Sequence, residues 1–437
     1  MTAVLRTARD TFRSLRVRNY RLYFFGQIVS TTGTWMQSVA QVWLVLRLTH
    51  SGLALGITTG LQFLPILFLG PLGGLVADRF DKRKVLILTQ AADAMLALTI
   101  GVLTLTGVIE LWMVYALALG LGLVTVVDNP TRQSFVAEMV GPGDLQNGIS
   151  LNSAVFTFTR ILGPAIAGAL ILTVGLAACF LLNALSFLAV IAGLVAMRPS
   201  ELHRGEPTPR MRGQIREGLR YVWTTPRLRW PLVLMAIVYT LSFNFSVLLP
   251  LLARFSFDGG AALYAQFLSA MGAGSLFGAL VMATRRRPSP QGLAWAAAAM
   301  GAAMVAAGVA PTVGVAFFVL AVIGFASMVF MATGNSMMQV GSAPSMRGRV
   351  MSIYAMVFLG STPIGGPLMG WLSEWAGPRI AFAVAGVVAV SSALAALWVL
   401  RALGGRGRVP VLLRRFTGQE PLPPQAESPA APEALSA

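Results

Sequence analysis

The chain has 437 residues, of which 56% are hydrophobic and only 11% are charged. Soluble domains carry about 25% charged residues, so this composition excludes a water-soluble protein and fits a protein whose solvent is lipid. The net charge of +17 does not indicate nucleic-acid binding, because the basic residues form short clusters between long apolar runs, as in loops at a membrane face.

The N-terminal segment is rich in arginine and leads directly into a long apolar run. A cleaved signal peptide has an apolar region of only about 7–15 residues, which this run exceeds. Residues 1–21 are therefore predicted to be a cytosolic basic leader in front of an uncleaved first span.

Twelve apolar runs approach the length of about 20 residues that a helix needs to cross a bilayer. They lie at 22–46, 53–76, 85–105, 111–127, 149–173, 177–197, 230–252, 263–284, 292–309, 313–335, 350–371 and 380–400. The arginine- and proline-rich stretch 198–229 divides them, which predicts six-helix bundles at 22–197 and 230–402 joined by a cytosolic linker. The polar, Pro- and Ala-rich residues 403–437 are predicted to be a disordered cytosolic tail.

The basic residues predict the orientation of these spans. All but four of the 33 Lys and Arg residues fall on one side; Arg47, Arg254 and Arg379 fall on the other, and Arg160 lies within a span. Because basic residues are enriched in cytosolic loops, we expect a multi-pass protein of the cytoplasmic membrane with both termini in the cytosol.

The first span carries a polar stripe whose members recur at steps of 4, 3, 4 and 3, which is one face of an α-helix. The stripe consists of Gln27, Thr31, Thr34, Ser38 and Gln41. Polar side chains are costly against lipid but not against a water-filled cavity, so the stripe is predicted to line a cavity, with Tyr239 and Asn244 added from the seventh span. The alternative for Ser and Thr is pairing with the backbone.

The loop after the second span reads Gly74-Leu75-Val76-Ala77-Asp78-Arg79-Phe80-Asp81-Lys82-Arg83. It resembles motif A of the major facilitator superfamily, Gly-x-x-x-Asp-Arg/Lys-x-Gly-Arg/Lys-Arg/Lys, and departs from it only at Asp81. The chain is also similar to the exporters that resemble the enterobactin exporter. That similarity rests on Arg18-Asn19-Tyr20-Arg21-Leu22 before Phe25-Gly26-Gln27, on Asp128-Asn129-Pro130 with Arg132, and on Arg160-Ile161-Leu162-Gly163-Pro164.

This resemblance implies an all-α membrane protein with twelve transmembrane helices in two parallel six-helix halves around a central cavity. It implies a monomeric secondary transporter that exports a small molecule, such as a siderophore, a drug-like compound or a secondary metabolite, with protons as the coupling ion. It also implies a gate at motif A, in which Asp78 faces the start of helix 11, near residues 346–350, and Arg79 and Arg83 bridge to Asp128. The alternative is that these are solvated loop charges.

Two ionisable residues are expected deep in the membrane, Asp93 at roughly 12 Å and Arg160 at roughly 16 Å from the ends of their spans. Charges within a membrane are usually paired and mark function. Either the two pair with each other, or Arg160 meets another polar group or an anionic substrate while Asp93 titrates.

The two halves of the chain repeat a similar pattern of glycine and proline residues. Gly163, Pro164 and Gly168 of the fifth span match Gly366, Pro367 and Gly370 of the eleventh. Both sets follow a loop with basic residues, Arg132 in the first half and Arg347 and Arg349 in the second. The pattern predicts a parallel internal repeat and close helix packing at both sites.

Several function classes are disfavoured. The sequence has no phosphate-binding loop of the Gly-x-x-x-x-Gly-Lys-Ser/Thr type, and its single cysteine and two histidines make a metal site improbable. We therefore expect no cofactor, no enzymatic activity, and no partner beyond the substrate, protons and the bilayer. Alternatives to an exporter are a lipid or lysolipid flippase of the same fold and a non-transporting membrane scaffold.

Overall fold

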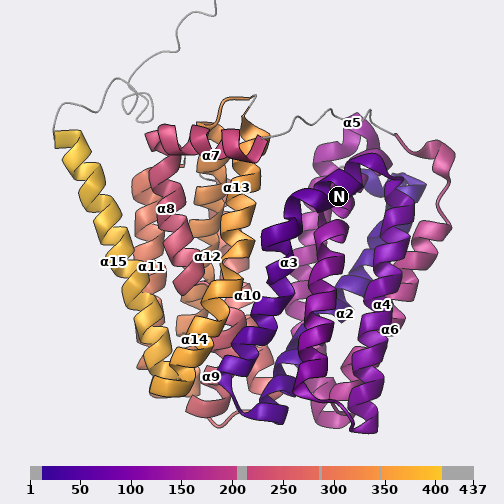
Figure 1. The fold of residues 1–437 in the computed structure, drawn as a ribbon, viewed down its shortest axis with the longest axis horizontal. Coiled ribbons are helices and arrows are strands. Elements are labelled where there is room, and N and C mark those ends of the chain that lie inside the picture. The colour runs from indigo at the N-terminus through magenta and orange to yellow at the C-terminus, as the bar shows by residue number, and fades with distance from the viewer. Residues whose placement is uncertain (1–11, 204–213, 285–287, 345, 406–437) are drawn as a thin grey trace, which may run out of the picture.

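A computed structural model describes residues 12–203, 214–284, 288–344 and 346–405, which form long helices side by side (Figure 1). The helices of the first half are η1 (Arg13–Arg16), α2 (Arg18–Thr49), α3 (Gly52–Arg79), α4 (Lys82–Thr106), α5 (Leu111–Thr173) and α6 (Leu176–Val195). After η2 (Pro199–Glu201) follow α7 (Gln214–Thr224), α8 (Pro226–Leu241), α9 (Phe245–Ser256), α10 (Ala261–Thr284), α11 (Pro290–Gly308), α12 (Val313–Gly341), α13 (Arg347–Gly360), α14 (Thr362–Ala376) and α15 (Pro378–Gly405).

The described helices make twelve membrane spans. Ten stretches are long and apolar enough to cross a bilayer, and one of them, α5, counts twice because Gly141 breaks its 63 residues with a φ of 69°. The remaining span is α2, the first in the chain, whose polar side chains lower its mean hydropathy. The seventh span consists of α8 and α9, interrupted at 242–244, and the eleventh of α13 and α14, joined at Ser361.

One expectation about a loop was wrong. The segment around Arg132 is not a loop, because α5 continues through it to Gly141, the first position where a positive φ ends the helical path, and Pro142. The stretch 198–229, predicted to be the linker between the bundles, contains α7 and the start of α8. Residues 1–11 of the leader and most of the tail lie outside the described residues.

The helices pack into two groups, one formed by α2 to α6 and the other by α8 to α15. In the first group α2 packs against α5 and α6, and in the second α11 packs against α12 and α15. Contacts between the groups are made chiefly by α3 with α14 and by α5 with α10. Figure 1 shows the two groups side by side, with the later helices on the left.

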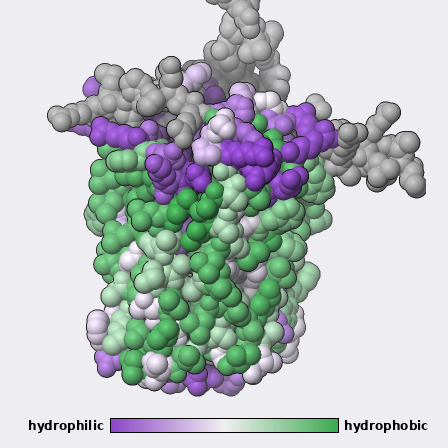
Figure 2. Space-filling view, turned by 90° about the vertical axis from the view of Figure 1, so that its right-hand side faces the viewer, coloured by the Kyte–Doolittle hydropathy of each residue, from purple (hydrophilic) through white to green (hydrophobic). Residues whose placement is uncertain are grey.

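Charged residues are concentrated at one end of the bundle, visible as the purple band above a largely green surface in Figure 2. We call this end, which carries η1, residues 78–83 and α7, the basic end, and the other the far end. Near the far end, Cβ atoms built on Gly52 and Gly56 of α3 would meet the carbonyl oxygens of Gly370 and Gly366 at 2.6 and 2.4 Å. A Cβ on Gly70, closer to the basic end, would meet nothing within 4 Å. These close contacts between α3 and α14 therefore belong to the far end.

Candidate functional site

Arg160 lies between the two groups of helices, away from both ends. Its guanidinium carbon is 5.6 Å from the centre of the Trp35 ring of α2, a cation–π distance. Tyr264 of α10, only 3% exposed, lies within electrostatic reach of the same guanidinium from the other group. The site is therefore built from both halves of the molecule.

Small residues bring these helices together. A Cβ on Gly163 would come within 2.5 Å of the Cβ of Trp35, so only glycine allows α5 to approach α2 here. One turn and a half later, Gly168 packs against Ala262 and Ala265 of α10. The two glycines thus set the spacing of the helices that carry Trp35, Arg160 and Tyr264.

Arg160 has aromatic rather than acidic neighbours. Phe156, one turn earlier on α5, makes an edge-to-face contact with Trp35, with ring centres 5.6 Å apart. Among the described residues no carboxylate pairs with Arg160, whose side chain is half-buried. A half-buried cation lined by aromatic rings is suited to an anionic group, or to an aromatic group bound over the guanidinium.

Of the alternatives left open by the sequence, the structure does not bring Arg160 and Asp93 together. Asp93 lies within electrostatic reach of Asp128 and Arg132, and Arg160 within reach of Tyr264. The physical reason is that α5 is two spans separated at Gly141, with Asp128 and Arg132 on one and Arg160 on the other.

Asp128 is the centre of a second polar cluster, formed by α2, α4 and α5. Its carboxylate is 1% exposed and accepts hydrogen bonds of 2.9 Å from Thr89 Oγ1 and Gln90 Nε2 on α4. Arg132, one turn further along α5, forms an ion pair with its other oxygen. Among the described residues Arg132, on the same helix, is the counter-ion of Asp128, so the predicted bridge from Arg79 or Arg83 to Asp128 is not formed in this conformation.

Among the described residues, three buried polar atoms of this cluster have no hydrogen-bond partner: Asp93 Oδ1, Tyr23 Oη and Arg132 Nε. Asp93 lies one turn after Thr89 and Gln90 on α4, so it faces the same side as the groups that bind Asp128. Two buried carboxyl groups, Asp93 and Asp128, thus lie within electrostatic reach of one guanidinium, that of Arg132.

The motif A residues lie at the end of α3 and the start of α4. Gly74 and Asp78 are half-buried in the last turns of α3, and Arg79 is exposed. Arg83 donates to the carbonyl oxygens of Leu194 and Val195, at 2.6 and 2.9 Å, and so caps the C-terminal end of α6.

The departure from motif A at Asp81 has a local explanation. The Asp81 side chain accepts a hydrogen bond of 3.2 Å from the backbone N–H of Lys84 and is the N-cap of α4. Lys82, the first residue of that helix, pairs with Glu138 of α5. Asp81 therefore starts the third span while the neighbouring basic residues bind other helices.

The polar stripe of α2 is largely turned into the protein. Gln27, Thr31 and Gln41 are buried, Ser38 is half-buried and Thr34 is exposed. The hydroxyls of Thr34 and Ser38 donate to backbone oxygens one turn earlier, at 3.0 and 2.9 Å, and thus need no other partner.

One polar contact of α2 escaped the sequence-based prediction. Gln37, outside the stripe, accepts a buried hydrogen bond of 2.7 Å from Asn183 of α6. The available signal was Asn183 itself, an amide in an otherwise apolar run, which needs a partner when buried.

The two residues expected from the seventh span lie in its interior. Tyr239 is 1% exposed, and its hydroxyl lies 3.3 Å from that of Tyr354 on α13 within a cluster of phenyl rings. Asn244 is 2% exposed at the break between α8 and α9 and donates to the Thr240 carbonyl at 2.7 Å. Tyr354, which the sequence did not single out, is the partner that satisfies Tyr239.

The second set of small residues lies at the contact between the groups. Gly366 and Gly370 pack against Gly56 and Gly52 of α3, close enough that an added Cβ would clash with backbone atoms. Pro164 and Pro367 lie inside α5 and α14.

Comparisons with known proteins agree with this architecture. Residues 9–406 match the family described as transmembrane secretion effector. The chain is 23% identical to a staphyloferrin A transporter of Staphylococcus aureus, over 88% of this chain and 96% of that protein. It is 27% identical to the multidrug efflux pump Tap of Mycolicibacterium fortuitum, over 83% and 90% of the two proteins. The fold is similar to that of a bacterial homologue of the lysosomal transporter Spinster in an inward-facing, occupied conformation, with a TM-score of 0.71, 15% identity, and coverage of 88% of this chain and 97% of that one.

Proposed function

Because the chain belongs to the transmembrane secretion effector family of the major facilitator transporters, we propose that it exports a small molecule from the cytosol by alternating access. The concentration of Lys and Arg at the basic end supports a cytosolic location for that end. The close α3–α14 contacts at the far end then support a state closed to the outside.

The observation that carries the substrate proposal is the position of Arg160 between the two groups. A residue held by α2 and α10 from opposite halves changes its surroundings when the halves move, which is what alternating access requires of a binding site. The guanidinium with Trp35 and Tyr264 selects compounds that carry an anionic group next to an aromatic or apolar one. A siderophore transporter and a multidrug pump among the relatives support a small-molecule substrate.

The Asp93–Asp128–Arg132 cluster supports proton coupling. Asp93 and Asp128 are buried together within reach of a single counter-ion, Arg132, and Asp93 Oδ1 has no partner among the described residues. Release and uptake of a proton by this cluster changes the charge inside the first half, and this links the proton gradient to its conformation. We propose Asp93 as the residue that titrates, because Asp128 is already neutralised by Arg132.

The substrate site is tested by transport in proteoliposomes with two probes. One is staphyloferrin A; the other is a macrolide, because the chain is also 23% identical to macrolide efflux protein A of Streptococcus pyogenes over 87% of this chain and 96% of that protein. Arg160→Ala should raise the apparent KM of the anionic probe about tenfold or more, because a hydrogen bond to a charged group contributes about 1.5–3 kcal/mol. Arg160→Lys should retain part of the affinity, and Arg254→Ala, an arginine at the far end of α9, is the matched control. Unchanged KM in Arg160→Ala would remove this residue from the site.

A further inference from the structure

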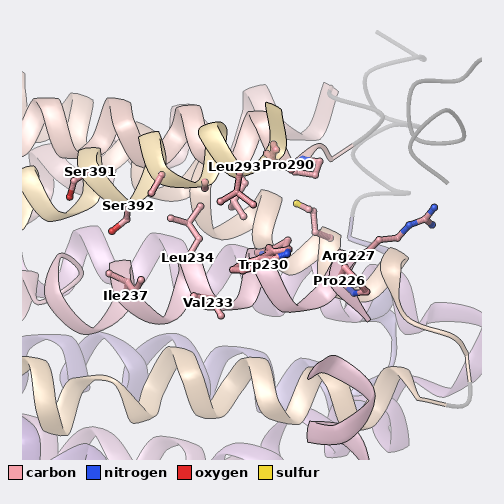
Figure 3. A pocket seen from close by; sticks show the side chains of 16 residues that line it. Pro226, Arg227, Trp230, Val233, Leu234, Ile237, Pro290, Leu293, Ser391 and Ser392 are labelled. Atoms are coloured by element: carbon pink, nitrogen blue, oxygen red, sulfur yellow. The ribbon is translucent and has the colours of Figure 1, made fainter. Parts of the chain in front are cut away.

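A groove in the second half lies outside the Arg160 site and the acidic cluster. It encloses about 510 Å³, within the range of about 300–1,000 Å³ that is typical of ligand pockets. Its walls are helices α8 and α15 and its floor is α11 and α12 (Figure 3). The lining includes Trp230, Leu234 and Ile237 of α8, Leu293 of α11, Met337 of α12 and Ala396 of α15.

The groove exists because α8 and α15 of the second half do not pack together along their whole length, as the corresponding helices of the first half, α2 and α6, do. In the first half, α2 and α6 pack so closely that a Cβ on Gly26 would clash with Val190, at 2.8 Å. The corresponding pair, α8 and α15, is joined near mid-span, where Ser242 Oγ donates to the Ala385 carbonyl at 2.7 Å. Toward the basic end the two helices enclose the groove instead of packing against each other.

The dimensions of the groove match one leaflet of a bilayer. From Arg227 to Ile237 the α8 wall rises about 15 Å, at 1.5 Å per residue. Half of a hydrocarbon core of about 30 Å is the same length. Trp230 and Ile237 are 40% and 39% exposed, so the wall is accessible from the outer surface of the helix bundle.

The lip of the groove is basic while its interior is apolar. Arg227 extends away from the groove toward the basic end in Figure 3, and Arg401 follows Leu400 on the opposite wall. The Arg229 guanidinium lies 4.8 Å from the centre of the Trp230 ring, a pair suited to the boundary between headgroups and acyl chains. Anionic lipids are attracted to such clusters of arginine next to a membrane span.

We propose that this groove binds one acyl chain of an anionic phospholipid from the leaflet at the basic end, with the headgroup held at Arg227 and Arg401. The apolar walls exclude a strongly polar solute, and the length and basic lip fit a membrane lipid entering sideways. The site is separate from the proposed transport route and does not depend on the substrate.

The test is native mass spectrometry of the full chain exchanged into mixed micelles that contain palmitoyl-oleoyl phosphatidylglycerol or phosphatidylcholine. The wild-type protein should retain one phosphatidylglycerol in preference to phosphatidylcholine. Ala396→Trp, which fills the groove, should lower the retained fraction about tenfold, equivalent to about 1.4 kcal/mol. Leu394→Trp on the exposed face of α15 is the matched control and should retain the lipid.

A second variant tests the contacts to the lipid headgroup and distinguishes a loss of binding from misfolding. Arg227→Gln with Arg401→Gln leaves the walls intact and should abolish the preference for phosphatidylglycerol, with an unchanged melting temperature. If Ala396→Trp and Leu394→Trp retain the lipid equally, or if the double Gln variant keeps the preference, the groove is not a binding site for an anionic lipid.

Discussion

At the scale of single residues, the two buried carboxyl groups Asp128 and Asp93 differ in the hydrogen-bond and ionic partners around them. Asp128 has a complete set of partners, with Thr89, Gln90 and Arg132 around its carboxylate. Asp93 has an unpaired buried oxygen one turn away. Removal of one charge from this cluster therefore has opposite consequences depending on which charge is removed.

We predict that Asp128→Asn lowers the stability of the first half by about 3–5 kcal/mol, because it leaves Arg132 buried without a counter-ion. Asp93→Asn should leave stability unchanged or increase it, since it removes a buried ionisable group whose Oδ1 has no partner among the described residues. Thermal unfolding in detergent measures both. Asp144→Asn is the control: Asp144 also lies on α5, but its partner is the more exposed Arg13 of η1, and breaking this pair should cost less than about 1 kcal/mol. A smaller loss in Asp128→Asn than in Asp144→Asn would contradict this account.

The sequence indicated which residues matter more reliably than it indicated their partners. Asp128 and Arg132 were visible as a pair of charges near the fourth span, and Arg160 as a charge within the fifth. Their contacts depend on where α5 breaks and on the rotation of α4 and α10 against it, which spacing within one helix does not determine. The stripe of α2 shows the same limit: its periodicity is helical, but which flank faces α6 depends on packing.

At the scale of elements, α3 is tied to the second half at the far end. Ser51 is the N-cap of α3, and its hydroxyl donates to Glu374 Oε2 of α14 at 2.6 Å. The same carboxylate oxygen accepts from the backbone N–H of Leu53 at 3.1 Å. Glu374 thus places a negative charge at the N-terminus of a helix of the other half, where the helix dipole favours it.

Loss of this contact should loosen the far end. We predict that Glu374→Ala broadens and lengthens the distance between spin labels at Thr49 and Trp375, measured by pulsed electron paramagnetic resonance. Glu110→Ala is the matched control, because Glu110 accepts from Trp112 of its own half at the same end. Identical distance distributions in wild type and Glu374→Ala would mean that glycine packing alone closes this end.

Helix α7 was not predicted from the composition of its segment. Its segment was interpreted as a linker because it is rich in arginine and lacks a long apolar run. In the structure, Val222 is buried, the Tyr221 hydroxyl accepts from the Ala343 N–H at 3.2 Å, and Glu217 pairs with Arg349 of α13 at 2.6 Å. A short amphipathic helix of this kind is stabilised by its tertiary contacts, which the sequence does not display.

At the scale of the whole molecule, the composition alone was enough to predict a polytopic helical membrane protein, and the repeat was enough to suggest two similar halves. The fold agrees because twelve spans with short connections leave few other arrangements. The break in the seventh span was not predictable, since no proline or glycine at 242–244 interrupts the run, whereas Gly360 and Pro363 flank the break in the eleventh.

The orientation of the molecule gives a direct prediction. In a background of Cys179→Ala, a cysteine at Gly205 should react with a membrane-impermeant maleimide only from the cytosolic side, and a cysteine at Gly259 only from outside. The reason is the concentration of Lys and Arg at the basic end. Reaction of both positions from one side would require a different number of spans.

The central claim is that the chain uses a proton gradient to export a small molecule. The most direct test is uptake of staphyloferrin A and of a macrolide into inside-out proteoliposomes whose lumen is more acidic than the medium. We predict uptake of at least one probe that collapses when a protonophore dissipates the gradient and that is lost in Asp93→Asn, although this variant remains folded. Uptake that persists without the gradient or in Asp93→Asn, or no uptake of either probe by correctly folded protein, would contradict the account.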